Sequence, residues 1–256
     1  MNLELDNKVV LITGSTKGIG RKTAATFANE GAEVWINGRS EESVKEALEE
    51  LRKQAPEGKF RSVVADVGNE EGIQHVIKSL PKVDILINNA GIFKPETFKE
   101  ISRDSWLKMF EVNVLSGARL TQHYLPIMIE NNWGRVIFVS SESGINIPEE
   151  MVHYGMSKTA QLAISRGAAE TCRGTFVTVN AVLPGPTLSD GVETFVEQMG
   201  VSEDEFFKTG RPSSIAQRFA ETREVADFIC FVASERASMI NGAALRVDGG
   251  TVKAAF

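Results

Sequence analysis

The sequence predicts an α/β fold, a single domain over residues 1–256 built around a doubly wound parallel sheet of about seven strands flanked by helices. Short runs rich in Val and Ile alternate with segments of helical period along the chain. Of the 256 residues, 42% are hydrophobic, which is enough for one full core. A glycine-rich turn also joins the first apolar run to the first helical segment.

Seven segments are expected to form buried strands because each is short, apolar and rich in β-branched residues. They are residues 8–13, 33–37, 61–65, 83–88, 134–140, 175–182 and 243–247. Helices are expected at residues 21–30, from 41 onward, at 69–80, 102–131, around 154–158 and at 222–234. Ser40 and Thr222 are predicted N-caps, and Gly31 follows the end of a helix. Strands and helices in this alternation give a parallel sheet.

The amino-acid composition indicates which kinds of binding partner the protein can have. Lys and Arg total 28 against 34 Asp and Glu, a net charge of −6 that is scattered along the chain. This argues against nucleic acid or an anionic membrane as the main partner. No basic and apolar leader and no apolar run of about 18 residues is present. Cys172 and Cys230 lie in apolar helical segments and offer neither a disulfide framework nor metal-ligand spacing. We expect a cytoplasmic protein without a metal site.

The glycine-rich turn, residues 13–20, reads TGSTKGIG. Gly14 permits a sharp exit from the strand, Gly18 lets backbone N–H groups approach a pyrophosphate, and Gly20 lets the helix lie close to the sheet. Such a turn is a weak signal alone and a stronger one between a strand and a helix. The expected cofactor contacts from it are Gly14, Ser15, Thr16, Lys17, Gly18, Ile19 and Gly20.

The end of the second strand indicates which dinucleotide is bound. It lies about 20 residues beyond the turn, where an NAD site places an Asp or Glu on the ribose 2′-hydroxyl. Here the chain has neutral Asn37 and Gly38 and cationic Arg39, and Lys17 could add a second positive charge. We therefore expect NADP(H) to be preferred, with NAD(H) possible. The alternative is that both cations are solvated loop residues.

Polar and small residues follow the next two strands. Asp66 and Val67 end the third strand, and Asp66 either accepts from the adenine amino group or caps the turn into the next helix. Asn89, Ala90 and Gly91 follow the fourth strand and are expected beside the cofactor.

Tyr154 and Lys158 are four residues apart, so on a helix they share a face. A phenol is a poor acid–base group at neutral pH because its unperturbed pKa is about 10. A cation at roughly 4 Å, in an effective dielectric of about 20, is worth on the order of 4 kcal/mol and would bring this pKa toward neutrality. We expect Tyr154 to exchange protons near physiological pH. The alternative is a lysine stem lying over a ring.

Three further residues lie near this pair. Ser141 stands past the fifth strand, 13 residues before Tyr154, so the intervening loop could bring its hydroxyl over the tyrosine. Asn113 lies within an expected helix, where it either loosens the helix and holds a water or is a surface residue. His153 is expected to face the substrate loop or solvent, because adjacent helical residues point about 100° apart.

Taken together, the motifs resemble the short-chain dehydrogenase/reductase family over nearly the whole chain. The matching positions are Thr13-Gly14, Gly18-Ile19-Gly20, Asn88-Asn89-Ala90-Gly91, Asn113, Ser141, Tyr154, Lys158, Pro184-Gly185 and Val247-Asp248-Gly249-Gly250. The resemblance implies a Rossmann fold, no metal, and a homotetramer or otherwise a dimer.

The resemblance also implies roles. Tyr154 would be the general acid in ketone reduction and the base in alcohol oxidation, and Lys158 would lower its pKa and hydrogen-bond the nicotinamide ribose. Ser141 would orient the substrate oxygen, and Asn113 would support a water that relays protons to Lys158. Pro184, Gly185 and Thr187 would lie at the cofactor, with Thr187 on the nicotinamide carboxamide.

The expected function is hydride transfer between NADP(H) and a small-molecule ketone or secondary alcohol, with residues 188–221 as a substrate lid. A different class is a catalytically inactive regulator that senses the dinucleotide. Within the enzyme class, a 3-oxoacyl-carrier-protein reductase is a sub-alternative. Against it, Asn132 lies near a position that is basic in those enzymes, and Glu142, Glu149 and Glu150 would repel an acidic carrier.

Overall fold

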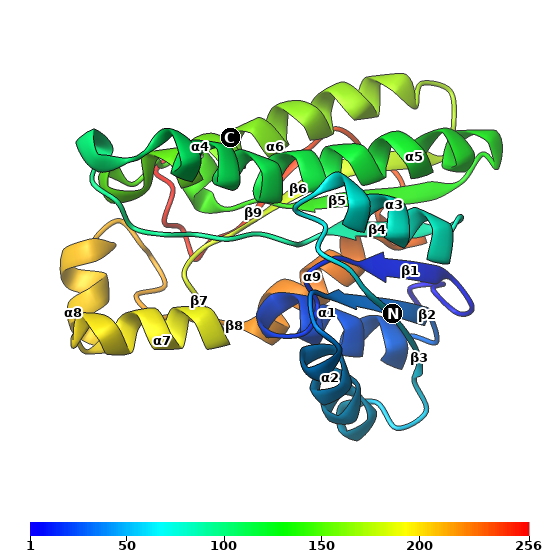
Figure 1. Cartoon of the computed structure of the whole chain (residues 1–256), viewed down its shortest axis with the longest axis horizontal. Coiled ribbons are helices and arrows are strands. Elements are labelled where there is room, and N and C mark those ends of the chain that lie inside the picture. The colour runs from blue at the N-terminus through cyan, green and yellow to red at the C-terminus, as the bar shows by residue number, and fades with distance from the viewer. Residues whose placement is uncertain (256) are drawn as a thin grey trace.

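A seven-stranded parallel sheet forms the centre of the molecule in the computed structural model, in the order β3-β2-β1-β4-β5-β6-β9 (Figure 1). The structure describes residues 1–255, without the side chains of 194, 195 and 197–199. The strands are β1 (Val9–Ile12), β2 (Glu33–Gly38), β3 (Lys59–Val64), β4 (Ile85–Asn88), β5 (Gly134–Val139), β6 (Val177–Pro184) and β9 (Ala244–Val247). The predicted doubly wound α/β fold is confirmed.

Helices cover both faces of the sheet (Figure 1). One layer consists of α1 (Gly18–Asn29), α2 (Glu41–Gln54) and α9 (Thr222–Val232), and the other of α3 (Glu70–Ser79), α4 (Arg103–Phe110), α5 (Ser116–Glu130) and α6 (Val152–Thr171). Each layer encloses its own apolar core, and Cys172 and Cys230 are both buried there as free thiols. In the described part of the chain, no helix has the length and apolar character to cross a bilayer.

The sheet order opens a crevice beside β1. The chain runs from β1 outward to β2 and β3 and then returns to β4, which lies beside β1 on the side opposite to β2. The segments that leave the carboxyl ends of β1 and β4 therefore diverge. Side-chain hydrogen bonds fix the two exits relative to each other. Thr13 Oγ1 accepts from the backbone N–H groups of Asn89 and Ala90, both at 3.0 Å, and Asn89 Nδ2 donates to the carbonyls of Thr13 and Gly14 at 2.9 Å.

Three helix boundaries differ from the sequence-based expectation. Helix α1 begins at Gly18 rather than at residue 21, so its N-terminus lies inside the glycine-rich turn. The tract at 102–131 is interrupted by a π-helical segment, Glu111–Leu115, between α4 and α5. The N-cap of α9 is Glu221 and not Thr222, because Glu221 and Glu224 form a reciprocal capping box.

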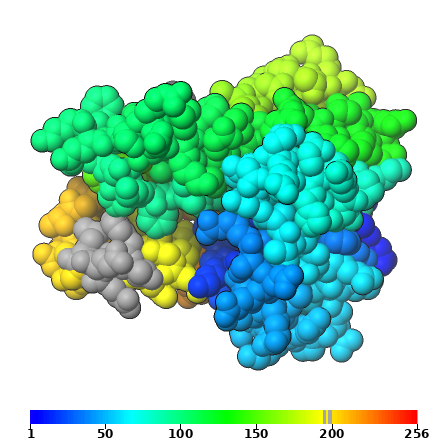
Figure 2. Space-filling view, viewed as in Figure 1, coloured from blue at the N-terminus to red at the C-terminus, as the bar shows by residue number. Residues whose placement is uncertain are grey.

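The segment after β6 forms a unit of its own. Short strands β7 (Thr187–Leu188) and β8 (Ala220–Glu221) pair in parallel and hold its two ends together. Between them lie α7 (Asp190–Met199), α8 (Glu203–Glu205) and a π-helical turn, Phe206–Gly210, with a small apolar cluster around Phe207 and Phe219. This unit projects at one end of the molecule in Figure 1, and in Figure 2 its yellow part borders a depression facing the blue first half.

Candidate active site

The glycine-rich turn packs closely against the β4 exit. Gly14 has a φ of +59°, and a Cβ there would lie 2.9 Å from Ala90 Cα. A Cβ on Gly20 would lie 2.5 Å from Asn89 Nδ2, so only glycine lets α1 approach this exit. Ser15 is buried, donates to the carbonyl of Ile12 and accepts from the backbone N–H of Asn37, so it shapes the turn instead of facing the crevice.

One half of the crevice is a cavity of about 250 Å³ between the exits of β1, β2, β3 and β4. It is lined by Gly14, Thr16, Asn37, Gly38, Arg39, Asp66, Val67, Asn89, Ala90, Gly91, Ile92 and Val112. The cavity thus brings together eight of the predicted cofactor residues, namely Gly14, Thr16, Arg39, Asp66, Val67, Asn89, Ala90 and Gly91. Lys17 is exposed and does not line this cavity.

Two side chains of this half have internal partners. Asn37 Nδ2 donates to the carbonyls of Val63 and Ala65, and Asn37 Oδ1 accepts from the backbone N–H of Gly14, so its amide holds neighbouring exits in register. Asp66 Oδ1 accepts from the backbone N–H of Gly68 at 2.9 Å, which closes the turn after β3. The helix that follows is capped by Asn69 instead.

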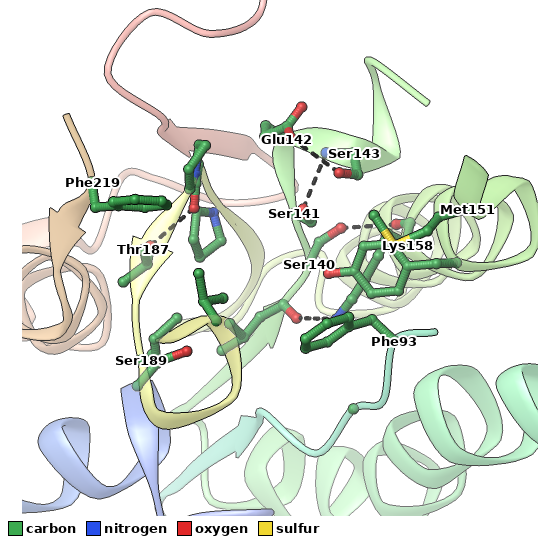
Figure 3. A pocket seen from close by; sticks show the side chains of 18 of the residues that line it. Phe93, Ser140, Ser141, Glu142, Ser143, Met151, Lys158, Thr187, Ser189 and Phe219 are labelled. Atoms are coloured by element: carbon green, nitrogen blue, oxygen red, sulfur yellow. Dashed lines mark hydrogen bonds between the residues drawn. The ribbon is translucent and has the colours of Figure 1, made fainter. Parts of the chain in front are cut away.

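The other half is a cavity of about 240 Å³ at the carboxyl ends of β5 and β6 (Figure 3). Ser141, Tyr154 and Lys158 line it, together with Pro184, Gly185 and Thr187 from the β6 exit and Ile19 from α1. Figure 3 shows Thr187 and Phe219 across the pocket from Met151 and Lys158. The two cavities share Asn89, Gly91 and Ile92, so they form one continuous path.

The pKa expected for Tyr154 is wrong in direction. Burial raises it to about 12, although a hydrogen bond with the Ser141 side chain lowers it. Lys158 Nζ lies 5.6 Å from the centroid of the tyrosine ring and donates to the carbonyl of Val139 at 2.9 Å. Burial also lowers the pKa of Lys158 to about 8. The Lys158 charge is distant from the phenol, and burying that charge is itself costly. Its attraction for the phenolate therefore does not offset the loss of hydration around the phenol.

Asn113 lies in the π-helical segment and is buried, so it is not a surface residue. Its Oδ1 accepts from the backbone N–H of Ile92 at 2.7 Å, and its Nδ2 donates to the carbonyl of Ile92 and to Ser157 Oγ, both at 2.9 Å. The backbone carbonyl of Asn113 accepts from Gln161 Nε2 at 2.6 Å. The sequence predicted that Asn113 loosens its helix locally. The π-helical segment is such a local widening of the helix, and π-helical turns of this kind often lie at functional sites.

His153 does not face solvent or the substrate loop. Its side chain is fully buried between α4 and the segment after β4, with an edge-to-face contact to Trp106 and its Nε2 3.3 Å from Glu96 Oε2. The direction away from Tyr154 was predicted from helical geometry. The burial was not, because the sequence does not show that α4 packs there.

An acidic residue that the sequence analysis did not identify lies at the glycine-rich turn. Asp190 Oδ2 accepts from the backbone N–H of Gly18 at 2.7 Å, and Asp190 Oδ1 lies 3.7 Å from Arg21. The N-terminus of α1 carries partial positive charge, which favours an anion at this point. A carboxylate from the first turn of α7 thus contacts the part of the turn where a pyrophosphate is expected.

Other lining residues were also missed: Phe93, Met151, Val192, Phe206, Arg211 and Phe219. The signal for Phe93 was its position two residues after Gly91, and the adjacent Phe206 and Phe207 indicated an apolar cluster in an otherwise polar segment. Nothing in the spacing shows that these residues meet near Tyr154.

The residues present fit a dinucleotide. The crevice continues from the cavity at the β2 exit to Tyr154 through Asn89, Gly91 and Ile92, and a Cβ on Gly91 would lie in this passage, 3.4 Å from Lys158 Nζ and 3.5 Å from Asn113 Oδ1. The turn presents the N-terminus of a 12-residue helix, suited to phosphate oxygens. Fold and site together define an NAD(P)-dependent oxidoreductase.

Comparison with known proteins gives the family. The family model described as enoyl-(acyl carrier protein) reductase matches residues 14–252. The uncharacterized oxidoreductase YvaG of Bacillus subtilis (strain 168) is 48% identical over 264 positions, covering 100% of both chains. The 3-oxoacyl-[acyl-carrier-protein] reductase FabG of Aquifex aeolicus (strain VF5) is 31% identical, covering 98% of this chain and 99% of the other.

A solved structure is also similar. L-sorbose reductase from Gluconobacter frateurii, complexed with NADPH and L-sorbose, superimposes with a TM-score of 0.86 and 30% identity, covering 99% of this chain and 100% of the other. The protein therefore belongs to the short-chain dehydrogenase/reductase family. It is an NAD(P)-dependent enzyme that acts on alcohol and carbonyl groups, which decides against the regulator considered as the alternative.

Proposed function

We propose that this enzyme transfers hydride between NADP(H) and a ketone or secondary alcohol, with Tyr154 as the general acid and base. The observation that supports this most strongly is the shared cavity. Ser141, Tyr154 and Lys158 come from the β5 exit and from α6, yet all line the pocket into which the nucleotide crevice leads.

The chemistry of the bound cofactor is hydride transfer to or from the carbonyl carbon. The chain supplies the proton and the orientation. A phenol with a pKa of about 12 is protonated at neutral pH, so Tyr154 donates a proton to the carbonyl oxygen during reduction. Ser141, which hydrogen-bonds Tyr154, holds that oxygen in place, and Lys158 stabilises the phenolate left behind.

Roles at the cofactor complete the proposal. Lys158 would also hydrogen-bond the nicotinamide ribose, Thr187 would contact the carboxamide, and Pro184 and Gly185 would lie at the cofactor. The water relay assigned to Asn113 stays part of the proposal, although its side-chain amide and its backbone carbonyl both have protein partners. The remaining proposed contacts are Gly14, Ser15, Thr16, Lys17, Gly18, Ile19, Gly20, Arg39, Asp66, Val67, Asn89, Ala90 and Gly91.

The preference for NADP(H) rests on Arg39, a cation that lines the cavity at the β2 exit. The similarity to L-sorbose reductase, whose structure contains NADPH, supports it. That enzyme and the similar 3-oxoacyl-carrier-protein reductase both act on carbonyl compounds, but the carrier-dependent reaction remains a sub-alternative because of the net charge of −6. The lid at 188–221, assembly as a homotetramer or dimer, and the cytoplasmic location stay predictions.

The test is absorbance at 340 nm over a panel of ketones and secondary alcohols with NADPH or NADP⁺. Tyr154→Phe should lower kcat by at least about 10³-fold while leaving the dissociation constant for NADPH within about threefold. Tyr124→Phe is the matched control, since Tyr124 is a buried phenol of the core that donates to the carbonyl of Leu80. Comparable turnover by Tyr154→Phe and the wild type would show that the proton comes from another group.

A further inference from the structure

Glu142, the residue after Ser141, is a buried carboxylate in the wall of the substrate cavity. Only 3% of its surface is exposed. Its Oε1 accepts from Ser143 Oγ at 3.1 Å and lies 3.6 Å from Arg211 Nε, which comes from the segment between β7 and β8. Its Oε2 is buried and has no hydrogen-bond partner among the residues whose side chains the structure describes.

A buried carboxylate oxygen without a donor costs free energy, on the order of 1–3 kcal/mol or more. Arg211 Nε is likewise buried and without a hydrogen-bond partner in the described part of the chain. Burial raises the pKa of the Glu142 carboxyl, and the guanidinium of Arg211 opposes that rise. Glu142 Oε1 accepts from Ser143, and Arg211 Nη1 donates to the carbonyl of Gly210 at 2.8 Å, but Glu142 Oε2 and Arg211 Nε add no hydrogen bond to offset the cost of burial.

Arg135, which is fully buried, shows what a purely structural pair looks like in this molecule. Arg135 donates to the carbonyls of Gly134 and Phe176, both at 2.8 Å, and lies 3.4 Å from Glu235 Oε2. It lines none of the cavities described above. Glu142 and Arg211 differ because both residues line the substrate cavity together with Ser141, where a substrate group could complete their hydrogen bonding.

We propose that Glu142 Oε2 accepts a hydrogen bond from a hydroxyl group of the substrate, so that the enzyme acts on hydroxy ketones and the corresponding vicinal diols. The inference rests on the proposed function, because it assigns the second polar group of the same substrate. A hydroxyl suits the pair, since it donates to the carboxylate and accepts from the guanidinium. Glu142 and Arg211 balance each other in charge, so a neutral group fits better than an ammonium or a carboxylate.

The remaining wall favours a small carbon skeleton around these polar groups. Phe93, Met151, Val192 and Phe219 are apolar, and the cavity measures about 240 Å³. A site that hydrogen-bonds a substrate hydroxyl discriminates strongly against an analogue that lacks it, because the buried polar group then stays unpaired.

The experiment compares four alcohols on one ring with NADP⁺: cyclohexanol, its vicinal diol, the vicinal methoxy alcohol and the vicinal amino alcohol. The wild type should oxidise the diol with a kcat/KM at least about tenfold above cyclohexanol and the methoxy alcohol, mainly through KM. Glu142→Ala should remove this difference. Glu142→Gln keeps an acceptor oxygen and should retain most of the preference.

Glu149→Gln is the matched control, because Glu149 is an exposed carboxylate seven residues away that does not line the cavity. Thermal unfolding checks that each variant is folded. If Glu142→Ala does not fold, the order of substrate preference in the wild type still tests the inference. Failure to oxidise any of the alcohols would count against the proposed function itself. Oxidation of cyclohexanol without a preference for the diol overturns only this inference, and so does a preference for the amino alcohol.

Discussion

Lys158 Nζ donates a hydrogen bond to the carbonyl of Val139 at 2.9 Å and lies 5.6 Å from the centroid of the Tyr154 ring. The ammonium is thus held by the end of β5 and not by the phenol. Burial disfavours the charged form of each group, so the pKa of Tyr154 is raised to about 12 and that of Lys158 is lowered to about 8. These two shifts set the pH dependence expected for the reaction.

Carbonyl reduction needs a protonated Tyr154 and a charged Lys158. With these pKa values we expect kcat/KM for reduction to be constant below about pH 8 and to fall about tenfold per pH unit above it, as Lys158 loses its proton. Alcohol oxidation needs the phenolate and the ammonium, so it should rise about tenfold per pH unit up to about pH 8 and then level off. Initial rates from pH 6 to 10 in both directions measure this, at roughly constant ionic strength.

A matched variant separates the two groups. In Lys158→Met the fall in reduction above about pH 8 should disappear, on a much lower baseline, because no ammonium titrates. A reduction profile that still falls at the same pH in this variant would assign the inflection to another group.

Lys158→Met should also stabilise the protein at neutral pH. The folded-state pKa of Lys158, about 8, is below its ordinary value of 10.5, so the unfolded chain binds more protons between these values and wild-type stability rises with pH across that window. Below about pH 8 the full penalty applies. We expect the free energy of unfolding of Lys158→Met at pH 7 to exceed that of the wild type by about 1–3 kcal/mol. This range allows for the loss of the hydrogen bond to Val139.

The measurement is urea unfolding of both proteins at pH 7 and pH 10, where the difference between them should shrink. Lys208→Met is the control, since Lys208 is exposed and pairs only with Asp204 at the surface. Equal stability of Lys158→Met and the wild type at pH 7 would mean that burial of this ammonium is not costly.

Asp190→Asn should tighten the binding of NADPH by roughly three- to tenfold. The carboxylate accepts from the Gly18 N–H at 2.7 Å, so it competes with pyrophosphate oxygens for the positive end of α1, and the amide removes its negative charge. Fluorescence titration gives the dissociation constants, with Asp204→Asn on the neighbouring helix as the control. Weaker binding by Asp190→Asn would show that this carboxylate supports the cofactor-bound form.

Arg39→Asp should reverse the preference between the two dinucleotides. An acid at this exit repels a 2′-phosphate and accepts from a 2′-hydroxyl, so the dissociation constant for NADPH should rise by about 10–100-fold while that for NADH falls. Lys17→Asp should have a smaller effect, because Lys17 does not line the cavity. Tighter binding of NADH than NADPH by the unmodified protein would refute the preference.

Asn113→Ala should destabilise the protein by about 2–4 kcal/mol, because it leaves the N–H and carbonyl of Ile92 without their partner. It should also lower kcat, since the same amide holds Ser157 beside Lys158. Asn241→Ala is the control: Asn241 bonds the backbone of Val177 and Val179 away from the site, so it should lose stability but retain kcat. An equal loss of kcat in both variants would show that Asn113 contributes to the stability of the protein and has no specific role in catalysis.

The fold class, the strand positions and the motifs that line the crevice could all be predicted from the amino-acid sequence. These follow from local signals: apolar runs mark buried strands, Gly14 and Gly20 mark close backbone approach, and the spacing of Tyr154 and Lys158 places them on one helical face. Parallel strands then carry their carboxyl ends to one edge of the sheet, which brings distant motifs together.

The charge states and the polar partners could not be predicted in this way, because they depend on how the chain packs in three dimensions. Desolvation depends on everything packed around a group, so spacing predicted attraction between Tyr154 and Lys158 but not the opposing cost of burial. The contacts of Asp190 with Gly18 and of Arg211 with Glu142 join residues far apart in the chain through the segment between β7 and β8. Hydrophobic periodicity carries no information about where such a segment folds back, because its position is set by packing against the finished sheet.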